Sequence, residues 1–154
     1  MAKKKQVEEA LSIRLFSRTP TMSRDITQVN HDTQHRLNVA KEHYSWLANY
    51  VLYENPYYKY TKSTRERIRK AVDAELEAAW EADRTIGEKA RKLKNKADRL
   101  NPLSKDHQEY WDEFILTQTN SYLAQARAYE KACNAIIEMS KIEVPWTNPS
   151  WWGK

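Results

Sequence analysis

Apolar residues in this chain recur at steps of three and four, which is the spacing of one face of an α-helix. The pattern is clearest between Ser23 and Val51, where Asp25 in the first turn suits the positive end of a helix dipole. It consists of Ile26, Val29, Thr33, Leu37, Ala40, Tyr44, Leu47 and Val51. We expect one long amphipathic helix here that ends at Asn55-Pro56, because proline disfavours helical angles in the residue before it.

The stretch from Ser63 to Leu100 predicts a second helix, around which we expect the rest of the chain to be organised. A continuous helix of roughly 36 residues extends about 54 Å. Ser63 and Glu66 form a capping-box pattern at its start, and Asn101-Pro102 stops it. A narrow seam, typical of a coiled-coil contact with one partner helix, is formed by Ala79, Ile86, Leu93 and Leu100.

A third long helix is predicted from Ser104 to about Ile142. Because the connection before it is short, this helix and the preceding one should lie antiparallel. Its apolar stripe is interrupted by Gln118, Asn120 and Gln125, which we expect to set the register or the number of subunits. The stripe consists of Trp111, Ile115, Tyr122, Tyr129, Ile136 and Met139.

The two ends of the chain differ from these long helices. Residues 4–17 predict a short amphipathic helix, which follows a lysine cluster formed by Lys3, Lys4 and Lys5. That cluster is either a solvated tail or a contact for phosphate or an anionic surface. Residues 144–154 predict an extended arm, because two prolines and a glycine exclude a regular helix there.

The arm carries the candidate partner-binding residues Trp146, Trp151 and Trp152. Each tryptophan removes roughly 150–250 Å² from water when it is fully buried, so the three are unusual in a free end. Three alternatives stay open. The arm folds back along its own bundle, it inserts into a pocket on a neighbouring subunit or partner, or it contacts a membrane interface.

The sequence therefore predicts an all-α protein with the form of an elongated antiparallel three-helix bundle or coiled-coil hairpin. Residues 1–20 would form the basic tail and short helix, 21–143 the long-helix bundle and 144–154 the arm. Only two of the 154 residues are glycine, which leaves little use for tight hairpins or phosphate-binding loops.

Composition narrows the cellular setting. The formal net charge of +5 permits an acidic partner, but acids and bases alternate along most of the chain, which weakens the signal for nucleic acid. A single cysteine, Cys133, excludes an intramolecular disulfide and fits a reducing compartment. No apolar run approaches the roughly 20 residues of a membrane span. We expect a cytoplasmic protein, or a component of a virion or particle assembled in the cytoplasm.

Aromatic and basic residues suggest two further contacts. Tyr57, Tyr58 and Tyr60 lie among lysines, an arrangement that stacks bases in single-strand binders, or alternatively one that plugs the end of a bundle and meets a protein partner. A basic run in the second half of the 63–100 helix is either an acid-paired, solvated face or a contact for nucleic acid or an acidic subunit. With the N-terminal cluster, the candidate nucleic-acid-binding residues are Lys59, Lys62, Arg65, Lys89, Arg91, Lys92, Lys94 and Lys96.

Patterns that indicate catalysis are weak. His31 and His35 have a spacing that can ligate zinc, but no nearby residue completes a ligand set. Glu109, Asp112 and Glu113 lie beside an indole, but carboxylates in an early helical turn are explained by the helix dipole. We expect no metal, no cofactor and no enzymatic activity.

These observations favour a non-enzymatic subunit of a larger assembly, such as a viral connector, scaffold or virion component. Its helical seams and the C-terminal arm would make contacts between copies. Two alternatives belong to other classes: a helical nucleic-acid-binding accessory protein, and a small protein inhibitor of a host enzyme.

Overall fold

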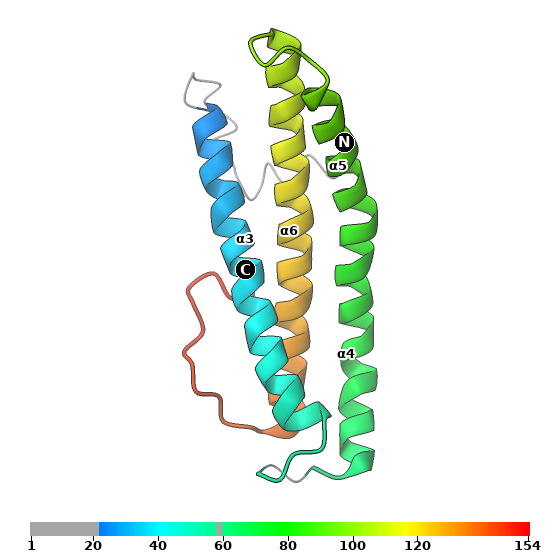
Figure 1. Ribbon diagram of the computed structural model, residues 1–154. Coiled ribbons are helices and arrows are strands. Elements are labelled where there is room, and N and C mark those ends of the chain that lie inside the picture. Colours follow the sequence, from blue (N-terminus) through cyan, green and yellow to red (C-terminus); the bar gives the residue numbers. More distant parts are fainter. Residues whose placement is uncertain (1–21, 58–59) are drawn as a thin grey trace. The chain divides into compact units, whose positions relative to one another are not determined.

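The computed structural model describes residues 22–57 and 60–154 (Figure 1). All regular structure within these ranges is helical, which confirms the predicted all-α class. The predicted helix at 4–17, Lys3, Lys4, Lys5, Tyr58 and Lys59 lie outside the described residues. In chain order the elements are α3 (Met22–Leu47), the π-helical η1 (Ala48–Leu52), α4 (Lys62–Ala82), the π-helical η2 (Asp83–Gly87), α5 (Glu88–Asp98) and α6 (Lys105–Ser140).

The chain divides into two compact units. Of the described residues, unit 1 comprises 22–35 and Glu81–Leu123, and unit 2 comprises 36–57, 60–80 and Ala124–Lys154. Helices α3 and α6 each contribute a segment to both units. Within each unit, the α6 segment runs antiparallel to the neighbouring segment of α4 or α5, as the short connection before α6 predicts (Figure 1).

The single helix predicted from Ser63 to Leu100 is present as three consecutive segments, because η2 interrupts α4 and α5. A π-helical turn leaves backbone groups without their usual α-helical partners. In unit 1 the hydroxyl of Ser121 donates a hydrogen bond to the carbonyl oxygen of Ala82 at 3.3 Å, just before this turn. Gly87 lies 3.6 Å from the Ser121 Oγ atom at the position where a Cβ would be, so α6 approaches η2 closely here.

The predicted capping box at Ser63 and Glu66 is wrong. Helix α4 begins at Lys62, and its cap is Thr61, whose Oγ1 accepts the backbone N–H of Thr64 at 3.1 Å. A threonine hydroxyl can accept a backbone N–H three residues later just as a serine hydroxyl can, so Thr61 rather than Ser63 is the N-cap of α4. The predicted start of α6 at Ser104 is confirmed, because Ser104 Oγ accepts the backbone N–H of His107 at 3.1 Å.

Two other helix ends differ from the prediction. Helix α3 stops at Leu47 and η1 carries the helical conformation only to Leu52, whose carbonyl oxygen accepts a hydrogen bond from the Arg69 guanidinium. Helix α6 stops at Ser140 rather than near residue 142. The next residue, Lys141, has a backbone φ of 58°, which is the left-handed conformation that ends many helices.

Unit 1 has a small apolar core with a polar contact beside it. Its buried apolar side chains are Ile26, Val29, Ala90, Phe114, Ile115 and Leu116. The amide of Asn30 donates to Thr119 Oγ1 at 2.9 Å and to Gln118 Oε1 at 3.2 Å. A polar contact of this kind favours the register of α3 and α6 in which donor and acceptor meet.

Unit 2 has the larger core, to which α3, η1, α4 and α6 all contribute. The most deeply buried side chains of this cluster are Leu47, Val51, Ile68, Val72, Ala132, Cys133 and Ile136. Residues 142–154 lie against the same core through Ile142, Val144, Trp146 and Trp152. The tail is therefore part of the packing of unit 2. Within the described ranges, no helix combines the length and the apolar character that crossing a membrane requires.

Candidate functional site

The C-terminal arm (residues 144–154) is docked on unit 2 of its own chain. The Trp146 indole stacks on the His43 imidazole, with ring centroids 3.9 Å apart and an interplanar angle of 12°. Its edge meets Trp46 at 5.3 Å and 85°. Farther along, the Trp152 indole N–H donates to Asn134 Oδ1 at 2.9 Å. Of the alternatives open from the sequence, the structure has the arm folded back on its own unit.

The end of the arm covers a buried ion pair between Arg36 on α3 and Glu130 on α6. The guanidinium donates two hydrogen bonds of 2.7 Å to the carboxylate, and the two side chains are 11% and 1% exposed. The backbone N–H of Gly153 donates a third bond to Glu130 Oε1 at 3.0 Å. Three donors thus satisfy a carboxylate that would otherwise be very costly to bury.

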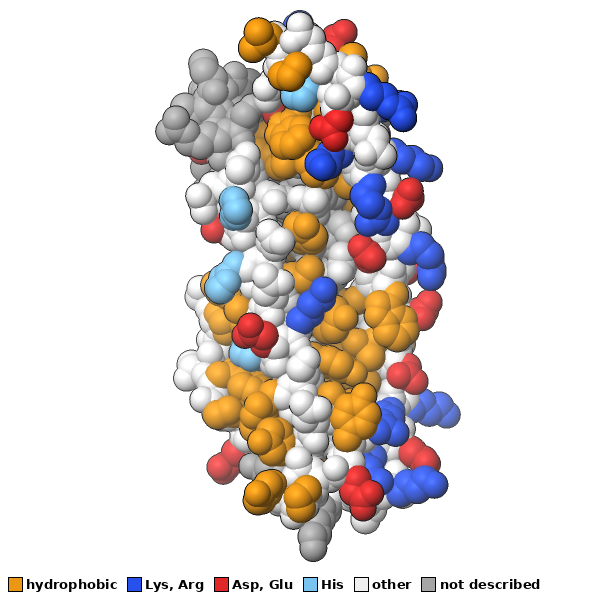
Figure 2. Space-filling model, in the orientation of Figure 1, with side chains coloured by type: hydrophobic (Ala, Val, Ile, Leu, Met, Phe, Trp, Pro, Cys, Tyr) orange, Lys and Arg blue, Asp and Glu red, His pale blue; other side chains and the backbone are white. Residues whose placement is uncertain are grey.

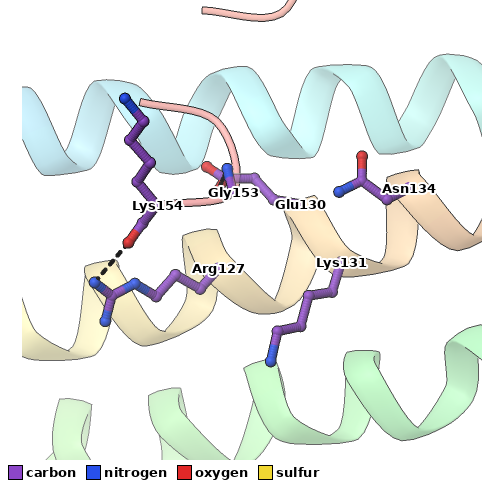
Figure 3. A pocket seen from close by; sticks show the side chains of 6 residues that line it. All are labelled: Arg127, Glu130, Lys131, Asn134, Gly153 and Lys154. Carbon is purple, nitrogen blue, oxygen red and sulfur yellow. Dashed lines mark hydrogen bonds between the residues drawn. The ribbon is translucent and has the colours of Figure 1, made fainter. Parts of the chain in front are cut away.

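A small hollow of about 90 Å³ lies where the arm ends on α6 (Figure 3). Arg127 donates a hydrogen bond to the backbone oxygen of Lys154 at 2.9 Å, and the Lys131 side chain points away from the arm. The hollow is too small for a substrate, since ligand pockets are typically several hundred Å³. It is best understood as the imperfect fit between arm and helix.

Two buried polar atoms where the arm meets α3, His43 Nδ1 and Trp146 Nε1, lack a hydrogen-bond partner in the described part of the chain. Burial lowers the pKa of His43 below its usual 6.5, and the nearby Glu42 carboxylate opposes that shift. Unpaired buried polar groups weaken a contact relative to a fully satisfied one. The docking of the arm is therefore specific in geometry and incomplete in its hydrogen bonds.

A second surface of unit 2, which we call the aromatic face, is formed by Tyr44, Tyr53, Trp80 and Tyr129. Tyr44 and Tyr129 meet edge to face at 5.7 Å, and both are half-buried. Trp80 and Tyr53 are 55% and 58% exposed. In Figure 2, hydrophobic side chains gather over the part of α4 that belongs to unit 2, with charged side chains of both signs along its outer edge.

Cations and hydrogen bonds hold the aromatic face in place. Lys41 Nζ lies 5.9 Å from the centre of the Tyr129 ring, and the Arg69 guanidinium lies 5.4 Å from the centre of Tyr53. Burial raises the pKa of Tyr129, and a side-chain hydrogen bond with Trp80 opposes the shift. Burial also raises the pKa of Tyr44. Both phenols therefore stay neutral at physiological pH.

The tyrosines of the connection between η1 and α4 separate into two environments. Tyr57 is 83% exposed. Tyr60 is half-buried and its hydroxyl donates to the carbonyl oxygen of Ser140 at 3.2 Å, which ties the connection to the end of α6. Tyr60 is therefore packed at the end of α6, whereas Tyr57 is exposed.

Most of the predicted nucleic-acid-binding cations in the described residues have protein partners. Arg91 lies 3.0 Å from Glu88 and 3.8 Å from Asp83, and Lys94 lies 3.9 Å from Asp98. Such exposed pairs are weak and would not prevent a phosphate from binding. The other contacts are Lys96 over the Tyr110 ring, Lys62 with Glu66, and Arg65 with the carbonyl oxygen of Tyr60; Lys89 and Lys92 are exposed.

The residues considered for metal binding or acid–base chemistry do not form a cluster of that kind. His31 and His35 are exposed, and the described residues contain no group of three or more side chains suited to hold a metal ion. Glu109 and Glu113 line a shallow hollow of about 390 Å³ in unit 1. Asp112 accepts a hydrogen bond from Gln108 at 2.8 Å.

Comparison with known proteins found no matching family model, no matching curated protein and no matching solved structure. Sequence reasoning missed the Arg36–Glu130 pair and the exposure of Trp80. The pair did leave a signal. Arg36 lies four residues before Ala40, and Glu130 lies three before Cys133, so both charges occupy positions of a buried face.

Proposed function

We propose that the protein is a non-enzymatic subunit of a larger protein assembly and that copies associate through the aromatic face of unit 2. The observation that carries this proposal is Trp80, a tryptophan that is 55% exposed on a helix of a packed unit. Tryptophan, tyrosine and arginine are the residues most enriched in the energetic centres of protein interfaces. The aromatic face combines all three types, since Arg69 covers Tyr53.

The rigidity of this face supports the proposal. An exposed aromatic side chain that is already held in place loses little conformational freedom on binding. Trp80 lies beside Tyr129, whose ring is packed edge to face against Tyr44. Charged side chains of both signs line the outer edge of this part of α4, which suits association with a second copy of the same surface (Figure 2).

The kind of assembly is proposed by analogy alone. All-helical subunits with few reactive clusters occur as connectors, scaffolds and virion components, and a cytoplasmic location or a particle assembled in the cytoplasm goes with that proposal. Two of the three tryptophans of the arm, Trp146 and Trp152, were at first candidates for contacts between copies and are engaged by the same chain here. The aromatic face is therefore the first surface to test.

Light scattering of the full chain at micromolar concentration tests the proposal. We expect a mass above that of one chain for the wild type and a lower mass for Trp80→Glu. Ala78→Glu is the matched control, because it adds the same charge to α4 at an exposed position about 200° around the helix from Trp80. A wild-type monomer, or an equal loss of mass in both variants, would refute the role of the aromatic face.

A second candidate function, binding to nucleic acid, is favoured by the exposed Lys89 and Lys92 on α5. Phosphate contacts release counterions, so the affinity for a labelled oligonucleotide should fall steeply between about 50 and 200 mM salt. The double variant Lys89→Ala/Lys92→Ala should weaken binding and reduce the salt dependence. An affinity that does not change with salt would exclude this candidate.

A further inference from the structure

We propose that copies of this protein exchange their C-terminal arms, so that the arm of one copy occupies the arm groove of another. The arm groove is formed in unit 2 by His43, Trp46, Glu130 and Asn134. Arg36 supports the groove from beneath through its two bonds to Glu130. This inference rests on the proposed self-association and names the segment that one copy supplies to the next.

Ile142 and Val144 pack against the core of unit 2 close to the hinge, whereas the ring and hydrogen-bond contacts that dock the arm lie at or beyond residue 146 and can be transferred intact. They are the stack of Trp146 on His43, the Trp152 indole N–H on Asn134, and the Gly153 backbone N–H on Glu130. A groove does not distinguish between its own arm and an identical arm from a second copy. The choice between the two is therefore made by the segment that joins α6 to the arm.

That joining segment is strained when the arm returns to its own groove. Lys141 adopts a φ of 58°, and it is the one non-glycine residue with positive φ in the described part of the chain. A side chain with a Cβ disfavours this conformation by 1–2 kcal/mol, which corresponds to roughly five- to thirtyfold. The local sequence carries no glycine or proline between Ser140 and Val144, and its apolar pattern predicts a helix to about residue 142.

Continuing α6 through Lys141 removes the strain and points the arm away from its own groove. The groove is then left without the apolar cover that Trp146 and Trp152 supply to the core of unit 2. The arm of a second copy restores that cover and the third hydrogen bond of Glu130. Reciprocal exchange gives a closed pair in which both grooves are filled and both hinges are relaxed.

The concentration at which exchange occurs depends on the effective concentration of the tethered arm and on the strain relieved at Lys141. A tethered arm competes with an effective concentration of roughly 1 mM, which favours the intrachain position. Relief of two hinges, each by roughly five- to thirtyfold, lowers the exchange concentration to about 1–40 μM. Exchange is therefore expected at ordinary experimental concentrations and within an assembly.

A thiol cross-linking experiment on the full chain tests the proposal. Lys131 and Lys154 are both exposed and line the same hollow at the end of the arm (Figure 3). Chains with only Lys131→Cys and chains with only Lys154→Cys are co-expressed, purified together and treated with bis-maleimides of increasing length, because the Lys131 side chain points away from the arm. Burial raises the pKa of the native Cys133 thiol to about 12, so it stays unreactive. Exchange predicts a covalent dimer that contains one chain of each kind.

Controls make each outcome decisive. The double variant Lys131→Cys/Lys154→Cys reports on any docked arm, and chains with Lys70→Cys in place of Lys154→Cys measure random collision. A cross-link within the double variant, combined with no mixed dimer above the Lys70→Cys background, would overturn arm exchange. Light scattering without cross-linker separates the two proposals, because a monomer refutes self-association whereas an oligomer with intrachain cross-links refutes only the exchange.

The hinge is tested by two substitutions in the same assay. Lys141→Gly tolerates a positive φ, so it should favour the intrachain arm and lower the yield of mixed dimer by roughly fivefold or more. Lys141→Ala keeps the Cβ and the preference for helix, so the yield should stay as in the unchanged hinge. An equal yield from the two variants would contradict the argument from strain.

Discussion

Arg36→Met offers the most direct test of how unit 2 is held together. The substitution keeps most of the side-chain volume and removes the cation from Glu130, whose side chain is 1% exposed. Two of the three hydrogen bonds described above for this carboxylate come from Arg36, and only the Gly153 backbone N–H remains. The variant therefore leaves a carboxylate buried without a countercharge.

Removing one partner of a buried ion pair costs about 3–5 kcal/mol. That is a large share of the roughly 5–15 kcal/mol by which a domain is stable. With a urea dependence of about 2 kcal/mol per molar, a loss of about 4 kcal/mol lowers the unfolding midpoint by about 2 M. The double variant Arg36→Met/Glu130→Met removes both charges and should recover most of this loss, because a well-packed apolar pair often replaces a buried ion pair at little cost.

Urea unfolding followed by circular dichroism measures these free energies. Lys94→Met is the matched control, since its pair with Asp98 is half-exposed and 3.9 Å long, and it should change stability by no more than about 0.5 kcal/mol. The reasoning is refuted if Arg36→Met costs less than about 1 kcal/mol, or if the double variant is no more stable than Arg36→Met alone.

Three further predictions concern single residues. Burial lowers the pKa of His43 below 6.5, and the Glu42 carboxylate opposes that shift. His43 therefore binds a proton more tightly when the arm is released, so docking should be complete above pH 6.5 and weaken as the pH falls below it. Tryptophan fluorescence between pH 7.5 and 5 should report this change, and His43→Gln should remove it. Gly87→Ala should stabilise the protein by about 0.5–1 kcal/mol in thermal unfolding, because the φ of Gly87 is already helical. The atom that would lie 3.0 Å from the new Cβ belongs to the movable Asp83 side chain. Destabilisation would show that Asp83 cannot move. Cys133 should resist a thiol reagent at pH 8 in the folded protein and react only after urea unfolds it, since burial raises its pKa to about 12.

Helix content was predictable because it depends on neighbours in the sequence. The stripe from Ile26 to Val51 needs only the 3.6-residue period, and the start of α6 needs only the hydroxyl of Ser104 within reach of a nearby N–H. The capping box at Ser63 failed for a related reason. Two hydroxyls compete for one helix start, and the geometry of the preceding loop decides in favour of Thr61.

The sequence showed which residues were candidates for a site, but not which of them lie close together in space. The tryptophans of the arm were identifiable by their number, whereas their docking on His43 and Asn134 depends on where α3 and α6 bring those side chains. The exposure of Trp80 was not predictable from the sequence, because it is set by the packing of unit 2.

The sequence by itself thus determined the secondary structure, the all-α class and the extended character of the arm, since each follows from local propensity, proline and periodicity. Only the tertiary structure decided that Arg36 meets Glu130 across 94 residues, that η2 divides the long helix, and that Lys141 turns the arm back. The physical reason is that charge pairing and burial depend on distance through space. A periodic pattern shows which face of a helix is buried but not which side chain lies opposite.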